Sequence, residues 1–437
     1  MFPNFLKASC LFFCVLGVGW VSSVAESSKK PSIPERTMWS LQFSPDLATL
    51  GVKPTWSDLD AWQETITRSR FETLLNTHYT SGPDAWADLI EITPSHAAIV
   101  MASANPKERY LLRFAETDNP RPPRFWRALS ELPANTPERP LTGLRIALDP
   151  GHMGGSWARM EERFFQLGDD PPVQEGDMVL QVGKLLEARL HDLGATVLWV
   201  RDQPGPVTML RPEALEPYTR AFLQARGQAE PMDPLVLEKV RNRIFCVNAE
   251  IRARAQRVNS QLKPDLVLAL HFNGEPWGAA DKPVFAEKNH LHVLVHGCLE
   301  RKELRHDDER FEMLVKLLQG TERLELDLAT NTAEALAAAT DLPPFTYNGS
   351  NARRVNTSPF VWARNLLASR IYQCPVIYLE PHVMNHALTY ERIQAGAYQG
   401  KKHIAGKERE NLYAEYATAV AHGLVAWREN QPTTPCP

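Results

Sequence analysis

The sequence predicts an α/β fold, in which a three-layer domain with a mostly parallel, twisted sheet flanked by helices follows a small α/β accessory domain. Three observations predict it. Short apolar runs alternate with helical segments through the C-terminal part of the chain, which is the order of elements in a parallel sheet. Those runs are continuously apolar, as in strands covered on both faces. A proline-rich stretch, in which regular structure is not expected, separates this part from the N-terminal one.

The first 25 residues have the features of a secretory signal peptide. Lys7 precedes an apolar run over residues 8–24, and small residues at the end of that run allow cleavage before Glu26. We therefore expect residues 1–25 to be removed and the mature chain to be exported, with no membrane segment. An uncleaved membrane anchor is the alternative, although the run is short for a span of about 20 residues.

Residues 26–119 form the predicted accessory module, and residues 120–140 form the linker behind it. Six prolines lie in the linker, so it is predicted to be irregular. The module combines a helix that has its apolar residues on one face with two strand-like runs. Its predicted elements are a helix over 57–75 and strands over 96–102 and 109–115.

Residues 141–430 form the predicted main domain. Strand-like apolar runs and helical segments alternate along it, which is the βαβαβ order of a parallel sheet. In chain order the predicted elements are a strand over 144–149, a helix over 175–193, a strand over 195–200, helical structure over 236–262, strands over 265–270 and 291–297, a long helical region from about 307, and a strand over 375–380.

Composition excludes several classes of function. The chain has a net charge of −4 at pH 7 and no basic block, so nucleic acid is not expected as a partner. The cysteines beyond the signal segment form no CxxC pair, which excludes a zinc ribbon or a redox motif. Disulfides are allowed in an exported protein, but the sequence does not choose among the three pairings of four cysteines, and buried thiols are an equal alternative. These cysteines are Cys246, Cys298, Cys374 and Cys436.

Polar residues follow three of the predicted strands where each strand ends. The strand over 144–149 runs into His152, the strand over 265–270 runs directly into His271, and the strand over 375–380 ends in Glu380. A fourth candidate, Glu175, opens the helix after the first loop. Because ligands bind beyond the carboxyl ends of parallel strands, we expect these four side chains to converge on one edge of the sheet.

Two imidazoles and a carboxylate are a normal ligand set for catalytic zinc, which keeps a fourth position for water. A second glutamate could then move protons as a general base and acid. Each residue also has a simpler explanation: His152 and His271 as turn residues, and Glu175 as a favourable charge at a helix N-terminus. Glu380 is harder to explain in this way, because burying an acid at the end of an apolar strand costs several kcal/mol without compensation.

Taken together, these segments resemble the zinc-dependent N-acetylmuramoyl-L-alanine amidases of peptidoglycan remodelling, whose catalytic domain opens with a strand and a DPGHGG loop. The loop here reads DPGHMGG. The stretch "EGDMVLQVGKLLEARLHDLGATVLWVRD" is similar to the family's ligand glutamate, its helix and a strand ending in arginine, here Arg201. The stretch "EIRARAQRVNSQLKPDLVLALHFNG" is similar to the family's Arg, Asn and SIHAN positions, here Arg254, Asn259, His271 and Asn273. The stretch "CPVIYLEPHVMN" is similar to the PAVLVETGFLSN element that carries the catalytic glutamate. The resemblance covers about Leu141 to Trp427.

The resemblance implies a zinc amidase that cleaves the amide between muramic acid and the stem peptide. It implies Zn²⁺ held by His152, Glu175 and His271, with Glu380 as the acid and base. Asp149 and Asn273 would orient the ligands as outer partners. Peptidoglycan or a muropeptide would be the substrate, and a periplasm the expected compartment, since no wall-binding repeats are evident.

Three departures from the family pattern leave alternatives open. The loop between His152 and Glu175 is long, so Glu161, Glu162 or Asp177 could replace Glu175 as ligand. After Glu380 the chain has Pro381 and His382, and His382 is either a substrate contact or a surface loop residue. Some relatives block the zinc with a helix inserted between the last two site residues until a partner binds. The segment "HDDERFEMLVKLLQG" has that position, while its charges favour a solvated helix face.

Two rival functions remain. His306 and Glu309 have the HxxE spacing of zinc carboxypeptidases, but they lie in a charged run with no strand leading into it, which favours a solvated helix. The other rival is a catalytically silent protein of the same fold that binds or regulates cell-wall material. Against it, all four functional positions hold chemically competent residues.

Overall fold

The computed structural model of the chain describes residues 40–118 and 123–431. The predicted signal peptide, residues 26–39 and 119 of the predicted accessory module, residues 120–122 of the predicted linker, and Cys436 lie outside this range. All described residues belong to one compact unit, and the predicted boundary between accessory module and main domain stays a prediction. Among the described residues, no helix is both long and apolar enough to cross a bilayer.

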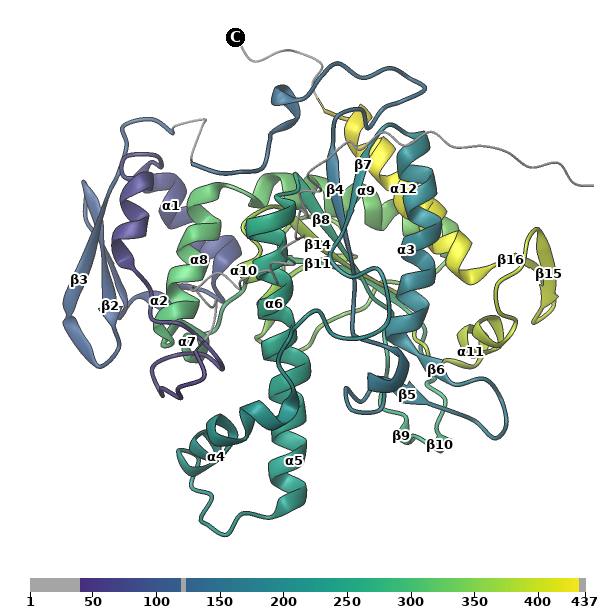
Figure 1. The fold of residues 1–437 in the computed structure, drawn as a ribbon. Helices are drawn as coiled ribbons and strands as arrows, with labels where there is room; N and C mark the ends of the chain where they lie inside the picture. The colour runs from purple at the N-terminus through teal and green to yellow at the C-terminus, as the bar shows by residue number, and fades with distance from the viewer. Residues whose placement is uncertain (1–39, 119–122, 432–437) are drawn as a thin grey trace, which may run out of the picture. The chain divides into compact units, whose positions relative to one another are not determined.

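A seven-stranded sheet forms the centre of the structure, in the order β12-β13-β11-β14-β8-β4-β7 (Figure 1). Four of its six strand pairs are parallel, and the other two are β11 with β14 and β12 with β13. The prediction of a mostly parallel sheet is therefore confirmed. Its strands are β4 (Arg145–Pro150), β7 (Thr196–Trp199), β8 (Leu266–Leu270), β11 (Leu291–His296), β12 (Ala352–Arg354), β13 (Val361–Arg364) and β14 (Val376–Pro381).

The register of the central strands aligns their carboxyl ends. Pro150 at the end of β4 lies opposite Leu270 at the end of β8, and Leu379 of β14 lies opposite the same Leu270. The residues that follow these positions therefore emerge side by side at one edge. The adjacent strand β11 runs in the opposite direction, so its first residues lie at this edge. Among them, His292 pairs with Glu380.

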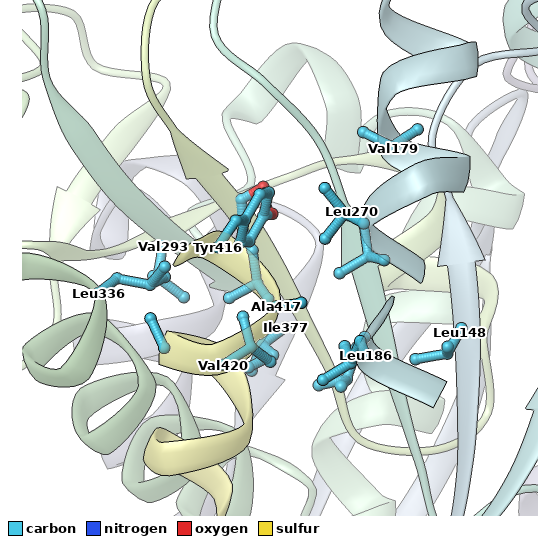
Figure 2. Packing of buried hydrophobic residues seen from close by; sticks show 14 of the residues in the cluster. Leu148, Val179, Leu186, Leu270, Val293, Leu336, Ile377, Tyr416, Ala417 and Val420 are labelled. Carbon is cyan, nitrogen blue, oxygen red and sulfur yellow. The ribbon is translucent and has the colours of Figure 1, made fainter. Parts of the chain in front are cut away.

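Helices cover one face of the sheet and form the larger hydrophobic core with it. Figure 2 shows side chains from β4, β8, β11 and β14 interlocking with Leu186, Leu336, Tyr416 and Val420. These four side chains are fully buried; burying each large apolar side chain contributes about 1.5–3 kcal/mol. The covering helices are α3 (Glu175–Asp192), α9 (Glu322–Thr340) and α12 (Leu412–Glu429).

A second hydrophobic cluster covers the opposite face of the sheet, which makes the domain three-layered. It joins Val267, Trp362 and Tyr378 of the strands to residues of α6, α10 and the turn after α6.

The predicted helical stretch over 236–262 is one helical path with two π-helical turns. The elements are α5 (Pro234–Arg243), a turn over Ile244–Ala249, α6 (Glu250–Gln256), a turn over Arg257–Leu262 and α10 (Leu367–Ile371).

The N-terminal part holds a three-stranded antiparallel sheet in the order β1-β2-β3. The predicted helix over 57–75 is wrong as a single element, because the chain breaks between residues 63 and 67, where Glu64 has a φ of +60° and Thr67 caps a new helix. The elements are a 3₁₀ turn over Trp56–Trp62, α1 (Arg68–Leu74), a π-helical turn over Leu75–Tyr79, α2 (Pro83–Trp86), β1 (Ile90–Ile92), β2 (His96–Ala102) and β3 (Asn105–Arg113).

The remaining elements are short pairs of strands and peripheral helices. They are β5 (Phe164–Phe165), β6 (Val173–Gln174), β9 (Gly278–Ala279), β10 (Lys282–Pro283), β15 (Lys401–Ile404), β16 (Lys407–Glu410), α4 (Glu216–Gln224), α7 (Arg301–Leu304), α8 (Asp307–Gln319), α11 (Ala387–Gln394), and 3₁₀ turns over Leu129–Glu131, Gly155–Trp157 and Pro212–Leu215. Cys246, Cys298 and Cys374 are free thiols.

Helix α8 corrects the expectation of a solvated charged face. Its charged residues Asp307, Asp308 and Arg310 are buried, because α8 packs its apolar residues into one hydrophobic cluster with the N-terminal part. Each charge has a partner: Arg310 bonds Asp307 at 2.8 Å, and Asp308 accepts the amide N–H of Ala48 at 2.9 Å. A charged run read from sequence does not reveal such partners.

The ion pair between Lys316 of α8 and Glu325 of α9 is completely buried, at 2.8 Å. Lys316→Met is expected to lower the free energy of unfolding by about 3–5 kcal/mol, because it leaves the Glu325 carboxyl buried without its partner. Lys302→Met, at a lysine with a 78 % exposed side chain, is the matched control and should change stability little. Urea unfolding followed by circular dichroism measures both, and equal midpoints would contradict the prediction.

Candidate metal centre

His152 lies on the loop after β4 and has a left-handed backbone conformation. Its φ is +57°, which residues with a Cβ rarely adopt. The preceding Gly151 is required by space, since a Cβ there would collide with the ring of His271. The two imidazoles consequently lie close together, with ring centroids 5.1 Å apart.

Glu175 is the first residue of α3 and is 1 % exposed. Its carboxylate lies between the two histidines: Oε2 is 3.0 Å from Nε2 of His152, and Oε1 is 3.1 Å from Nδ1 of His271. The amide N–H of Phe272 also donates to Oε1 at 3.1 Å. The helix start thus delivers the carboxylate to the point where the β4 and β8 segments meet.

His271 follows β8 directly, and its neighbours hold both its backbone and its ring. Its amide donates to the carbonyl of Leu379 at 3.0 Å, and its carbonyl accepts the hydroxyl of Tyr416 at 3.2 Å. The ring stacks on Tyr378 with centroids 5.2 Å apart. Strand pairing and aromatic packing therefore fix where this imidazole points.

Ligand atoms of His152, Glu175 and His271 all lie within 4.8 Å of one another. In the part of the chain that the structure describes, this is the group of His, Cys, Asp and Glu side chains arranged to hold a metal ion. Two nitrogens and one oxygen suit zinc, whose bonds to such ligands are about 2.0–2.2 Å long and whose catalytic sites commonly have three protein ligands. The residues present therefore fit a zinc ion.

The alternative ligands raised by the long loop have other partners. Glu161 accepts the amide N–H groups of Met153 and Gly154, and Asp177 accepts the amide N–H of Gly155 at 2.9 Å. The rival His306 faces Glu309 at 3.5 Å and is not part of the three-residue group. Glu162 is exposed and lies 3.5 Å from Lys239.

The electrostatics of the three groups favour a cation between them. Burial lowers the pKa of His152, but the carboxylates of Glu175 and Glu161 outweigh it and raise that pKa to about 9. Burial likewise raises the pKa of Glu175, yet the His152 charge and the hydrogen bonds from both histidines hold it well below its usual range. Burial lowers the pKa of His271. The carboxylates thus stabilise one positive charge at this point, which a metal ion could supply.

Two buried arginines hold the His152 loop through its carbonyl groups. Arg254 of α6 donates to the carbonyls of Pro150 and His152, at 2.8 and 2.6 Å. Arg201, after β7, donates to Gly151 at 3.1 Å. The predicted outer partner Asp149 contacts the loop through Arg254, because its carboxylate accepts a hydrogen bond from the Arg254 guanidinium at 2.8 Å.

Glu380 stands at the end of β14, where its strand neighbours bring it beside the metal centre. Burial raises its pKa to about 8, with a further contribution from the negative charge of Glu175 and an opposing one from His152. The side-chain amide of Asn273 donates to the backbone carbonyl of Glu380 at 2.8 Å. Asn273 therefore ties the end of β8 to the residue predicted to move protons.

His382 occupies a different environment from the other predicted site residues. It is 2 % exposed, and its Nε2 lies 3.6 Å from Glu415 of α12. Burial lowers its pKa. Its side chain thus faces the covering helix α12 and not the group formed by His152, Glu175 and His271.

A cavity of about 650 Å³, which was not evident from the sequence, shares Arg163 with the surroundings of the candidate metal centre. Arg159, Arg163 and Trp277 are among the residues that line it. Arg163 connects it to the centre, since its Nε lies 3.2 Å from Oε2 of Glu175. No sequence signal marked these residues, because they come from two loops that meet only in the fold.

No protein-family model matches the sequence, and no curated protein is similar enough to count as a match. Among solved structures, the chain is similar to the N-acetylmuramyl-L-alanine amidase Ami1 from Mycobacterium smegmatis, with 18 % identity and a TM-score of 0.37, covering 67 % of this chain and 99 % of that one. It is also similar to the CwlD amidase from Clostridioides difficile, solved in complex with the GerS lipoprotein, with 12 % identity and a TM-score of 0.36, covering 66 % and 100 %. A third is the N-acetylmuramoyl-L-alanine amidase AmiC2 of Nostoc punctiforme, with 14 % identity and a TM-score of 0.29, covering 66 % and 98 %. At TM-scores this low, the similarities decide nothing about the chemistry of the present site.

Replacing any of the three ligands should weaken zinc binding by more than about 100-fold, since loss of even an outer partner of a ligand costs about 10–100-fold. The variants are His152→Ala, Glu175→Gln and His271→Ala, and Glu162→Gln is the control because its side chain is 65 % exposed. Competition with a chromogenic chelator measures the dissociation constants. Wild-type affinity in Glu175→Gln would remove Glu175 from the ligand set.

Proposed function

We propose that the protein is an exported, zinc-dependent N-acetylmuramoyl-L-alanine amidase that cleaves the amide between muramic acid and the stem peptide of peptidoglycan. The observation that carries the proposal is the convergence of His152, Glu175 and His271 within 4.8 Å, with Glu380 at the end of β14, the strand that pairs with β8. The DPGHMGG loop and the Glu380 segment, which resemble the amidase family, supply the substrate class.

His152, Glu175 and His271 would hold the ion, and Glu380 would move the proton. When bound, zinc supplies a Lewis acid that polarises the scissile carbonyl and makes water easier to deprotonate. The Glu380 carboxylate accepts a proton from the attacking water and returns it to the departing peptide amine. Burial raises the pKa of Glu380 above its ordinary value, toward the range in which one carboxyl group can serve as general base and then as general acid.

The cavity beside the centre would receive the peptide side of the substrate. Trp277 provides an apolar wall, packed against Phe165 at 5.2 Å between ring centroids. The Arg159 guanidinium lies 3.6 Å from the centroid of the Phe164 ring and offers donors to a carboxylate. An apolar wall with a few placed polar groups is the usual make-up of a ligand pocket.

Export and a cell-wall substrate are consistent with each other. The segment predicted as a signal peptide would carry the mature chain out of the cytoplasm, and the periplasm is the compartment we propose. No regulatory partner is assigned. The competing proposal, a catalytically silent wall-binding protein, shares the fold but requires Glu380 to have no chemical role.

Glu380→Gln is expected to lower kcat about 10²–10⁴-fold, because it removes the group that transfers the proton, while zinc affinity stays at the wild-type value. Mass spectrometry of digested sacculi and of soluble muropeptides, compared with wild type, measures release of stem peptide. A wild-type protein that binds one zinc ion but releases no peptide from either substrate would favour the silent wall-binding protein.

Trp277→Ala is expected to raise KM about tenfold with kcat nearly unchanged, because the pocket wall contributes binding that is equal in ground state and transition state. Leu235→Ala is a matched control, since Leu235 is an apolar residue that is 75 % exposed on α5. Steady-state kinetics with a soluble muropeptide separates the two constants. An unchanged KM would show that the cavity does not bind substrate.

A further inference from the structure

Glu161 is a buried acid beside the metal centre that none of the assigned roles uses. It belongs to the long loop between His152 and Glu175, and its side chain is 3 % exposed. We propose that Glu161 is a positioning residue, which orients the imidazole of His152 and thereby sets the affinity of the site for zinc. This inference rests on the proposed function, since it requires His152 to be a metal ligand.

The Glu161 carboxylate uses both oxygens on one short segment of the ligand loop. Oε1 accepts the amide N–H of Gly154 at 2.9 Å, and Oε2 accepts that of Met153 at 2.9 Å. Oε2 also lies 3.6 Å from Nδ1 of His152. One side chain therefore contacts the ring of His152 and the two backbone groups that follow it.

The loop needs an acceptor at this place because of its backbone conformation. His152 and Gly154 have φ values of +57° and +69°, a turn that directs consecutive amide N–H groups toward one point. Such an arrangement binds an anion, and leaving the buried donors without an acceptor would cost about 1–3 kcal/mol each. Glu161 fills the place with a carboxylate from the same chain.

The same carboxylate selects the ring orientation that a metal ligand requires. Nε2 of His152 points to Glu175, at 3.0 Å, while Nδ1 points to Glu161. A proton on Nδ1, facing the carboxylate, leaves the lone pair of Nε2 free for the ion. A carboxylate behind a ligating histidine fixes its tautomer and raises its basicity, and loss of such a partner costs about 10–100-fold in metal affinity.

The test is Glu161→Gln in the full-length protein, with zinc as the probe. Glutamine has one acceptor oxygen in place of two, so the backbone amides and the imidazole compete for it. We expect the zinc dissociation constant to rise about 10–100-fold, and the visible spectrum of the Co²⁺-loaded protein to change. Glu162→Gln is the control at the adjacent exposed residue and should bind zinc as the wild type does.

A double-mutant cycle separates positioning of His152 from a general effect on folding. In a His152→Ala background, Glu161→Gln should change zinc affinity less than about twofold, because the ring that Glu161 orients is absent. A penalty equal in both backgrounds would overturn the proposal. Urea unfolding of the metal-free variants provides a check of the fold that does not depend on zinc.

The remaining outcomes distinguish failure of this inference from failure of the proposed function. If wild type and Glu161→Gln bind zinc equally well, the positioning role is wrong while the metal centre stands. If Glu161→Gln loses zinc completely while Glu175→Gln retains it, Glu161 is itself a ligand, and the positioning role is again wrong. If the wild type binds no zinc, the proposed function fails first.

Discussion

The candidate metal centre depends on the parallel register of β4, β8 and β14. With Pro150 and Leu379 both opposite Leu270, the residues after these strands leave the sheet at the same level. Strand pairing brings together the segments that carry His152 and His271, which are far apart in sequence, and the start of α3 places Glu175 between them. A shift of one residue in the register of a strand would turn each of its side chains to the opposite face of the sheet. The burial of apolar side chains fixes the register of these strands, and the register in turn fixes the positions of the residues that follow them.

Burying so many charges beside one another requires them to be balanced. Glu175 and Glu161 surround His152, while Asp149 and Glu250 both bind Arg254. Since an unpaired buried charge is far more costly than a paired one, the acids that orient the loop and the arginines that hold its carbonyl groups have to be present together. Glu380 differs, because no strong partner offsets its burial, and its pKa rises instead. That difference separates Glu380 from the carboxylates that hold the loop in place.

The sequence was informative wherever a periodic pattern or a strand end carried the signal. Every predicted strand of the central sheet is present. The runs that became β4, β8, β11 and β14 are apolar because they are buried almost throughout, whereas β7 is a partly exposed edge strand. The ends of β4, β8 and β14 led to His152, His271 and Glu380. Prediction from the sequence failed where contacts between distant segments determine whether a charged side chain is buried and what it binds. The charges of α8 are buried by partners elsewhere in the chain, and the carboxylate of Glu161 is explained by a loop conformation that has no pattern of its own. The roles of Arg163 and Trp277 depend on the same kind of tertiary contact.

Helix α6 connects the packing of α8 with the ligand loop. Arg254 of α6 donates to the carbonyl of His152, and Arg252, two residues earlier, lies 3.4 Å from Asp308 of α8 with both side chains buried. Helix α8 has the chain position of the blocking helix of some relatives. It is held in place by α6 and by the N-terminal part. Moving α8 onto the metal centre would leave Arg252 and Asp308 without their partners, at a cost of several kcal/mol. In this conformation the pair between Asp308 and Arg252 joins α8 to the helix that carries Arg254, which argues against α8 as a plug for the site.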